Sequence, residues 1–524
     1  MSFSHLVELK NFNVFPEYFI GISALYILIV IVLITYNVYG LIVQKAISEC
    51  MGLILLLSCY LILNDDLVFS GNGFELYSTL GFYKASVSDY FAFCTKFIIA
   101  FFSSLYFFLI ADFLKEHKLT SFEYLLILLF AVLGLLLLCS SNDLLTAYLS
   151  IELISLSSYV LAAFKKTSSY SAEAGVKYLV TGAISSAFFL LGSSFMYAYS
   201  GTISITDFWL IMSDAGWFST TNAFHLFEPF LEIGLTFVIF SLFIKLALAP
   251  FHVWSLDVYE GSPTISTFFF AVITKLSFFV FLVRISYIAA FKYYEAYQFY
   301  AVIIALFSVF LGSFGGLRQR KLKTLLAYSS VSHMGYALLA FSAGSRFGTE
   351  MLLFYLIIYM LSGLGVWFVI LTTQVNRKRY TDKFSKELAD LALLRKSNPA
   401  LALSLTLTMF SIAGIPPLVG FFAKMGVFLS VLHAKYYFVA LLAILCSVVS
   451  TFYYIRIVKI LYFENILVGK LYYPIINAKT LLFSVVTFSL LFLFVNPTML
   501  YLMVYKVILC SFAGDILASL SVSL

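Results

Sequence analysis

The amino-acid sequence predicts an all-α polytopic membrane protein with about fourteen transmembrane helices. Hydrophobic residues make up 62% of the chain and charged residues only 11%, whereas a soluble protein carries about 25% charged residues. Apolar runs of about 20 residues, the length that crosses a bilayer, recur almost from end to end. One helical bundle in a membrane therefore accounts for the 524 residues better than several soluble domains do.

The expected spans follow one another in chain order, with boundaries at the ends of the apolar runs. They cover residues 18–40, 44–64, 90–113, 121–140, 144–164, 175–199, 229–251, 263–290, 297–317, 323–344, 350–373, 400–433, 436–462 and 479–503. Residues 504–524 are apolar enough to continue the last span or to lie at the membrane interface.

Prolines interrupt two of these helices: Pro250 lies in the seventh, and Pro416 and Pro417 lie in the twelfth. Proline removes a backbone donor, so inside a membrane the freed carbonyls must be satisfied by protein or water. Interruptions five helices apart predict two inverted five-helix repeats, helices 4–8 and 9–13, because transporters place ion sites at such breaks. A simple packing kink is the alternative for either helix. The predicted parts are an N-terminal three-helix segment (1–113), the first repeat (114–290), the second repeat (291–462) and a C-terminal helix with its tail (463–524).

Loop charges predict the orientation of the chain. The loops after odd-numbered helices hold most of the basic residues, namely Lys165, Lys166, Arg318, Arg320, Lys321, Lys323, Arg377, Lys378, Arg379, Lys383 and Lys386. The loops after even-numbered helices hold few bases and carry Asp65, Asp66, Glu75, Asp207 and Asp214. The positive-inside rule then places the odd loops on the cytoplasmic or matrix side and both termini on the opposite side.

Five ionisable side chains fall inside or at the breaks of the predicted spans: Glu152, Lys245, Lys275, His333 and Lys424. A charge at the bilayer centre costs about 2.5–3.5 kcal/mol on insertion scales, so such residues usually serve ion or proton movement. Burial disfavours the charged form of a lysine, a nearby carboxylate favours it, and histidine exchanges a proton near neutral pH. The set therefore predicts the stations of a proton path.

Each station also has a plainer interpretation. Glu152 could be a neutral carboxyl group bonded to a hydroxyl, and His333 could be a satisfied core histidine. Lys245 could snorkel to the interface if Pro250 ends its helix. His252, next to this proline, is expected at the mouth of the path.

The acidic pair in the same loop favours a structural role. Asp257 and Glu260 precede the eighth helix, which has Pro263 in its first turn. Negative charge and proline both suit the start of a helix, so we expect the two carboxylates to cap it.

The sequence contains no motif for a nucleotide, metal or nucleic-acid site. The chain lacks GxGxxG, P-loop and HExxH motifs. Its cysteines contain no CxxC pair and are expected to be buried thiols: Cys50, Cys59, Cys94, Cys139, Cys446 and Cys510. The net charge of +6 is spread out and offers no basic patch for nucleic acid. Redox cofactors are therefore expected on other subunits.

Four segments resemble the family of NADH dehydrogenase (ubiquinone) subunit 2, the antiporter-like subunit of respiratory complex I. They are PFHVWSLDVYEGSP (250–263), KYLVTGAISSAFFLLG (177–192), QRKLKTLLAYSSVSHMGY (319–336) and FSIAGIPPLVGFFAKMGVF (410–428). Lys424 favours subunit 2, because the subunit 4 relatives typically have a glutamate in that helix. Leu256 departs from the family, which usually has proline there; this alters a loop turn and no proton-bearing residue.

The resemblance implies a proton-translocating membrane-arm subunit with fourteen helices. It implies that Glu152, Lys245, Lys275 and Lys424 are the helix 5 glutamate and the helix 7, 8 and 12 lysines of the family. NADH, FMN, iron–sulfur clusters and ubiquinone would then be bound by partner subunits, and the neighbours would be an antiporter-like subunit, small core membrane subunits and lipid. The mitochondrial inner membrane is the expected location, with a bacterial plasma membrane or a thylakoid as alternatives.

Three other functions remain open at this point. The first is a chloroplast-type NDH subunit that works with plastoquinone. The second is an Mrp-type cation/proton antiporter subunit, and the third is a membrane scaffold that has kept only the fold.

Overall fold

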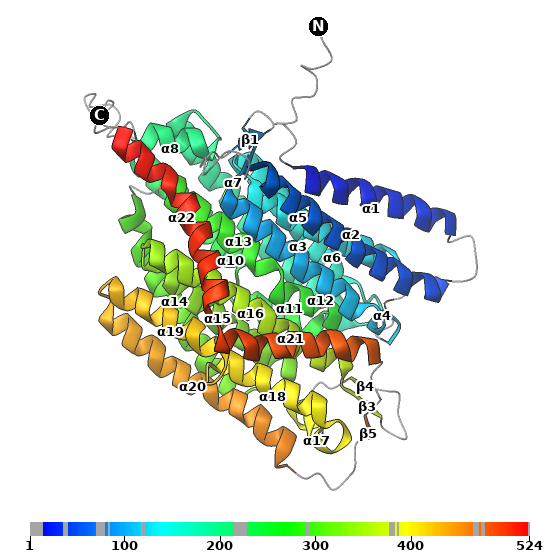
Figure 1. Cartoon of the computed structure of the whole chain (residues 1–524). Helices are drawn as coiled ribbons and strands as arrows, with labels where there is room; N and C mark the ends of the chain where they lie inside the picture. The colour runs from blue at the N-terminus through cyan, green and yellow to red at the C-terminus, as the bar shows by residue number, and fades with distance from the viewer. Residues whose placement is uncertain are drawn as a thin grey trace.

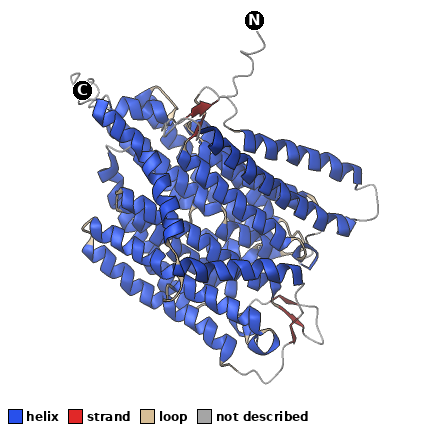
Figure 2. Ribbon diagram, in the orientation of Figure 1, coloured by secondary structure: helices blue, strands red, loops and turns tan. Residues whose placement is uncertain are grey.

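The computed structural model describes residues 14–34, 40–69, 79–81, 84–116, 119, 121–213, 228–289, 293–376, 383–384, 387–392, 394–464, 471–472 and 477–521. Most of these residues are helical, and the short strands lie at two edges of the bundle (Figure 2). The helices pack side by side along much of their length (Figure 1).

The N-terminal part contains α1 (Phe15–Ile34), α2 (Gly40–Phe69), α3 (Tyr90–Ile110) and the short α4 (Phe113–Glu116). Strands β1 (Thr79–Gly81) and β2 (Ser86–Ser88) form an antiparallel pair before α3. Asp89 starts α3 as its N-cap, accepting a hydrogen bond from the backbone N–H of Ala92 at 2.9 Å.

The next part begins with α5 (Glu123–Ser140), α6 (Leu144–Ala163), α7 (Ser169–Ser200) and α8 (Ile205–Ser213). It continues with α10 (Glu228–Lys245), α11 (Val253–Gly261), α12 (Thr264–Val272), α13 (Thr274–Val283) and a π-helix (Arg284–Ala289). The predicted seventh span (229–251) therefore covers α10 and the turn after it, whereas α11 lies in the predicted loop, and the predicted eighth span (263–290) covers α12 and α13.

The later part contains α14 (Tyr294–Leu317), α15 (Leu322–Ser342), α16 (Arg346–Thr372), α17 (Leu394–Ser397), α18 (Pro399–Ala413), α19 (Val419–His433) and α20 (Tyr437–Tyr462). A 3-10 turn (Leu388–Leu391) and the strands β3 (Gln374–Asn376), β4 (Lys383–Phe384) and β5 (Leu471–Tyr472) lie at one edge. Helices α21 (Asn477–Val495) and α22 (Thr498–Ser521) follow and pack against α16 (Figure 1).

The predicted all-α, multi-pass class is confirmed. Among the described residues, ten helices are long and apolar enough to cross a membrane, or eleven if α21 and α22 count as one bent span. The predicted span over 479–503 is a bent pair, because α21 and α22 meet at an angle of 82°. Pro497 lies at this bend, where it can start a helix but cannot continue one.

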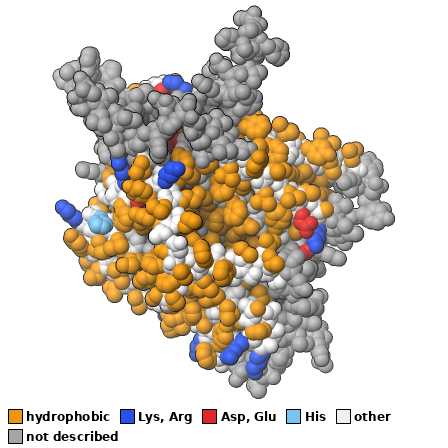
Figure 3. All heavy atoms as spheres, viewed as in Figure 1, with side chains coloured by type: hydrophobic (Ala, Val, Ile, Leu, Met, Phe, Trp, Pro, Cys, Tyr) orange, Lys and Arg blue, Asp and Glu red, His pale blue; other side chains and the backbone are white. Residues whose placement is uncertain are grey.

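Burial identifies the centre of the bundle. The most apolar 18-residue window of Thr264–Tyr287 is 94% buried and that of Arg346–Thr372 is 89% buried, against 28% for α1. The helices α12, α13 and α16 therefore form the core, whereas α1 exposes a wide apolar face. Hydrophobic side chains cover much of one face of the molecule, with charged side chains near its edges (Figure 3). A lipid-facing surface has this pattern.

Two sequence predictions, the charge pattern of the loops and the burial of the cysteines, lie partly outside the described residues. Outside them fall Glu75, Asp214, Arg377, Lys378, Arg379 and Lys386, together with the side chains of Asp65, Asp66 and Cys510. Of the remaining cysteines, Cys59, Cys94, Cys139 and Cys446 are buried free thiols as predicted, but Cys50 is exposed.

Candidate functional site

The interruption of the seventh span places Lys245 inside the bundle. Helix α10 ends at Lys245 and α11 begins only at Val253. Ala247 between them has a left-handed φ of +58°, which costs a non-glycine residue about 1–2 kcal/mol. Trp254 Nε1 donates to the carbonyl of Ile244 at 3.0 Å, so a protein side chain satisfies a carbonyl at the break.

Lys245 contacts α6 through Tyr159. Its Nζ donates to Tyr159 Oη at 3.3 Å and lies 5.7 Å from the centre of the same ring. Glu152 lies two turns before Tyr159 on α6, on the same face of that helix. Ser155 Oγ donates to Glu152 Oε2 at 3.2 Å, which is the hydroxyl contact expected in the plainer interpretation. Tyr159 thus connects Lys245 to the face of α6 that carries Glu152.

Gly182 of α7 makes room for this site. A Cβ atom at position 182 would lie 1.6 Å from Tyr159 Oη. No side chain larger than hydrogen fits there without moving the tyrosine, so the glycine allows Tyr159 to reach Lys245.

The interruption of the twelfth span brings Lys424 against a helix end. Helix α18 ends at Ala413, and Gly414 continues in the left-handed region with φ +80°. Lys424 Nζ, in α19, donates to the carbonyl of Ala413 at 2.7 Å. This carbonyl belongs to the negative end of the α18 dipole, which stabilises a cation. Gly420 permits the close approach, since a Cβ there would lie 1.8 Å from the carbonyl oxygen of Ser411.

Lys275 lies buried in the bundle and has fewer polar contacts than Lys245 and Lys424. It is the second residue of α13, directly after the interruption at Ile273. Within the described residues its Nζ has no hydrogen-bond partner. The nitrogen lies 5.5 Å from the ring centre of Tyr359 on α16, an arrangement that holds a cation by its attraction to the ring face.

His333 lies between two tyrosine hydroxyls. Its Nδ1 is 2.5 Å from Tyr355 Oη, and its Nε2 is 3.0 Å from Tyr454 Oη. A small cavity joins this region to Lys424 and is lined by His333, Tyr355, Tyr359, Ser362, Ser411 and Lys424. Lys275 approaches His333 across Tyr359, whose ring centre lies 5.4 Å from that of His333. The structure therefore groups these three ionisable residues as a second site.

His252 stays apart from both groups. It lies in the chain between α10 and α11 and is half-buried, with its ring 6.4 Å from that of Tyr328. Its Nδ1 is buried and has no hydrogen-bond partner in the part of the chain that the structure describes.

The prediction that Asp257 and Glu260 cap the eighth helix is wrong. Both belong to α11, and the N-cap of α12 is Pro263, which makes no side-chain cap. Asp257 pairs with Lys177 of α7 at 2.6 Å, and Glu260 pairs with Lys321 before α15. The carboxylates therefore tie α11 to α7 and to the start of α15 instead of capping α12.

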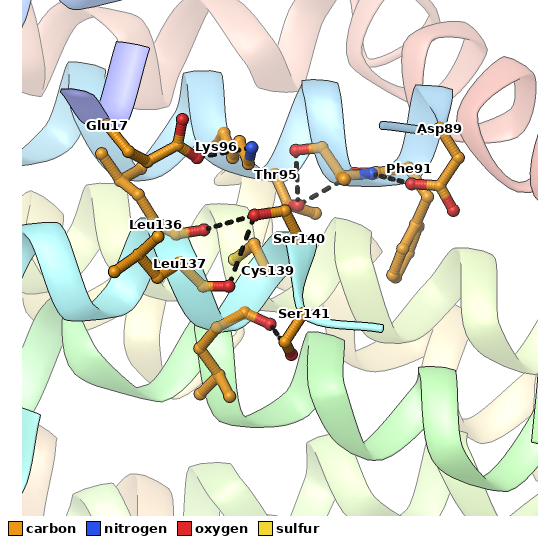
Figure 4. A network of polar contacts seen from close by, with 12 residues as sticks. Glu17, Asp89, Phe91, Thr95, Lys96, Leu136, Leu137, Cys139, Ser140 and Ser141 are labelled. Atoms are coloured by element: carbon orange, nitrogen blue, oxygen red, sulfur yellow. Dashed lines mark hydrogen bonds and ion pairs between the residues drawn. The ribbon is translucent and has the colours of Figure 1, made fainter. Parts of the chain in front are cut away.

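Two buried ion pairs in and beside the N-terminal helices were missed by the sequence reasoning. Lys96 Nζ of α3 lies 2.5 Å from Glu17 Oε1 of α1, with side-chain exposures of 5% and 2%. Arg284, which follows α13, pairs with Asp89 at 3.0 Å and also donates to the carbonyl of Cys139 at 3.3 Å. Figure 4 shows Glu17, Lys96 and Asp89 in one network with Thr95 and the end of α5. The sequence signal for the first pair was the position of Lys96 within an apolar run.

The tyrosines around the lysines were also missed. Tyr159, Tyr336, Tyr355, Tyr359 and Tyr454 are indistinguishable in sequence from the other tyrosines of this aromatic-rich chain. The four-residue spacing of Tyr355 and Tyr359, which places them on one face of α16, was the only signal. In the described residues no group of three or more His, Cys, Asp and Glu side chains could hold a metal ion.

Interrupted helices with lysines at the breaks, inside a bundle of membrane-spanning length, define the class of antiporter-like membrane proteins. The family described as "NADH:quinone oxidoreductase/Mrp antiporter, TM" matches residues 141–450. The chain belongs to this family, and within it to the subunit N and chain 2 group.

Relatives in sequence support the narrower assignment. NADH-ubiquinone oxidoreductase chain 2 of Marchantia polymorpha is 38% identical over 399 residues, covering 76% of this chain and 79% of the relative. NADH-quinone oxidoreductase subunit N 1 of Rhizobium meliloti is 41% identical, covering 67% of this chain and 70% of the relative. The resemblance inferred from the four sequence segments is therefore confirmed.

Solved structures share the fold. A chain of respiratory complex I from Thermus thermophilus with bound aureothin matches with a TM-score of 0.72 and 25% identity, covering 93% of this chain and 98% of that chain. A chain of the Mrp complex from Dietzia matches with a TM-score of 0.77 and 17% identity, covering 96% and 97%. The second likeness concerns the fold alone.

Proposed function

We propose that this chain translocates protons as a membrane-arm subunit of an NADH:quinone oxidoreductase. One observation carries the proposal: buried His333 and Lys424 line one small cavity beside the interruption of the twelfth span, and buried Lys275 lies against the ring of Tyr359, which lines the same cavity. Ionisable residues in such a place are retained for ion or proton movement.

The path that we propose starts at the first group. Glu152 near Lys245 favours a charged lysine. When the pair separates, Lys245 gives its proton toward Lys275, and Lys275 gives one to Lys424 through His333. The carbonyl of Ala413 then receives the charged Lys424 at a helix end. Energy from quinone reduction on other subunits drives the separation of the pair.

The proline interruptions of the seventh and twelfth helices fit two inverted repeats, helices 4–8 and 9–13, and Lys275 of the second group comes from helix 8 of the first repeat. Ten described helices have spanning character, and the bent pair α21–α22 adds an eleventh span. Fourteen result when the pair α10–α11, the pair α18–α19 and the polar helix α15 are each counted as a span as well. The divisions 1–113, 114–290, 291–462 and 463–524 follow these repeats. The positive-inside rule orients both termini away from the cytoplasmic or matrix side.

Partner subunits complete the enzyme in this proposal. NADH, FMN, iron–sulfur clusters and ubiquinone are bound elsewhere in the complex, next to an antiporter-like neighbour and small core membrane subunits. The proposed location is the mitochondrial inner membrane. Marchantia polymorpha supplies the chain 2 relative and several bacteria supply subunit N relatives, so a bacterial plasma membrane is the alternative.

Lys245→Met and Lys424→Met in the assembled complex test the function. Each variant should lose most proton translocation in proteoliposomes while the complex still assembles, because methionine keeps the apolar stem and removes the proton carrier. Lys165→Met, at an exposed position, is the matched control. Full translocation by both buried-lysine variants would refute the proposal.

The fold also occurs in an Mrp complex, so a cation/proton antiporter is the second candidate. Purification distinguishes the two. Flavin and iron–sulfur subunits that reduce a quinone should accompany this chain, whereas cation-dependent proton exchange without them would support the antiporter. Reduction of plastoquinone by ferredoxin would instead indicate a chloroplast-type NDH.

A further inference from the structure

The partners of His333 suit a residue that changes its protonation state. Tyr355 of α16 and Tyr454 of α20 contact its two ring nitrogens through their hydroxyls. A hydroxyl both donates and accepts, whereas a carboxylate or a backbone carbonyl only accepts. Both neutral tautomers of His333 and its cation can therefore be hydrogen-bonded on both sides without any movement of the helices.

The two lysines approach His333 across tyrosine rings. Lys275 Nζ is 5.5 Å from the centre of the Tyr359 ring, which lies 5.4 Å from the His333 ring. Lys424 Nζ is 5.4 Å from the centre of the Tyr336 ring, which lies 6.3 Å from the His333 ring. Each lysine is thus separated from His333 by one tyrosine ring, and each ammonium can rest on a ring face when charged.

Tyr355 occupies the side that leads to Lys424. It lines the cavity together with His333 and Lys424, and its hydroxyl makes the short 2.5 Å contact with Nδ1. Tyr454 lies on the other side, where its hydroxyl also receives a hydrogen bond from Tyr453 at 3.5 Å. The two hydroxyls therefore differ in position: one faces the cavity and the other anchors the ring to α20.

We propose that Tyr355 is a proton-carrying residue between His333 and Lys424, and that Tyr454 is a positioning residue for His333. The inference rests on the proposed function. In the step, the Nδ1–H bond of a doubly protonated His333 breaks while a new O–H bond forms on Tyr355. The original O–H bond of Tyr355 breaks and an N–H bond forms on the neutral Lys424. Tyr355 ends neutral, and one proton has moved from His333 to Lys424.

Tyr355→Phe in the assembled complex is the direct test, because phenylalanine keeps the ring and removes only the hydroxyl. Coupled proton translocation in proteoliposomes should fall at least fivefold. Tyr297→Phe is the matched control: its hydroxyl is equally buried and donates to the carbonyl of Ser286 at 2.7 Å, away from the lysines. The control should stay within twofold of the parent. Tyr454→Phe should lower the rate less than Tyr355→Phe, because Tyr454 carries no proton.

A second variant separates proton transfer from packing. A fluorinated tyrosine at position 355 keeps the hydroxyl and nearly the same size but makes the phenol more acidic. The translocation rate should change at position 355 and stay constant when the same residue is placed at position 297. This comparison also decides the matter if Tyr355→Phe fails to assemble.

Two outcomes would overturn the inference. One is normal translocation by Tyr355→Phe, and the other is a fluorinated residue 355 that behaves like tyrosine. His333→Asn distinguishes a failure of the role inferred for Tyr355 from a failure of the proposed function. If His333→Asn stops translocation while Tyr355→Phe does not, only this inference fails. If His333→Asn and Lys424→Met both translocate normally, the proposed function fails with it.

Discussion

Gly182→Ala tests how the structure positions Tyr159 against Lys245. The added Cβ would lie 1.6 Å from Tyr159 Oη, whereas carbon and oxygen atoms normally stay about 3.3–3.6 Å apart. The hydroxyl must therefore move by roughly 2 Å. The Lys245–Tyr159 hydrogen bond is already long at 3.3 Å, so this movement breaks it.

The size of the effect follows from the bond that is lost. A hydrogen bond to a charged group is worth about 1.5–3 kcal/mol, and the long distance favours the lower end. A loss of about 1.4 kcal/mol corresponds to a factor of ten, so we expect about a tenfold slower proton translocation. Alanine favours the helix over glycine by about 1 kcal/mol, which offsets part of the packing cost and helps the variant to assemble.

The assay compares proton uptake and quinone reduction in proteoliposomes. Gly21→Ala is the control, since its Cβ would meet only Leu133 at 3.6 Å, an ordinary contact. It should behave like the parent. Tyr159→Phe, which removes the bond without a clash, should reproduce the Gly182→Ala rate. The reasoning fails if Gly182→Ala translocates at the parent rate, or if Tyr159→Phe does so while Gly182→Ala is slow.

Three further predictions concern a buried ion pair, a close helix contact and an exposed ion pair. Lys96→Met should destabilise the assembled protein by about 3–5 kcal/mol, because it leaves Glu17 buried without its partner. The double variant Glu17→Gln with Lys96→Met should recover most of this loss in thermal unfolding. Equal melting temperatures of the single and double variants would contradict this prediction. Gly420→Ala should prevent stable assembly on a native gel, because its Cβ would meet a backbone oxygen, which cannot move aside as a side chain can. The exposed Lys321–Glu260 pair raises the pKa of Lys321 through a hydrogen bond from its ammonium group; its contribution, below about 1 kcal/mol, should persist at neutral pH and disappear as the pH rises above the usual lysine range, and a larger loss of thermal stability in Lys321→Ala would contradict that estimate.

The sequence predicted the membrane class and the ionisable residues for a clear physical reason. Lys275 and Lys424 stand out because a charge in an apolar run is costly wherever the run folds. Pro250 and Pro416 mark the interruptions for the same reason, since the backbone loses a donor there whatever surrounds it. Both signals are local, and the structure places all four residues at or beside a break.

The partners of these residues depend on helix packing and could not be predicted in the same way. Tyr355 and Tyr454 contact His333 only because α16 and α20 both pack near α15. Asp257 and Glu260 looked like helix caps by position along the chain, but lysines from α7 and before α15 reach them in space. The bend at Pro497 was missed because hydropathy measures composition and not direction.

The number of protons translocated per electron pair in a complex that carries Lys275→Met tests the central claim most directly. In the proposed path Lys275 stands between Lys245 and Lys424. Its Nζ has no hydrogen-bond partner within the described part of the chain, so the substitution would remove the proposed proton carrier without breaking a hydrogen bond. We expect a lower ratio, or a coupled rate at least tenfold slower, with the complex assembled and the Lys165→Met control unchanged. An unchanged ratio at the parent rate would contradict it.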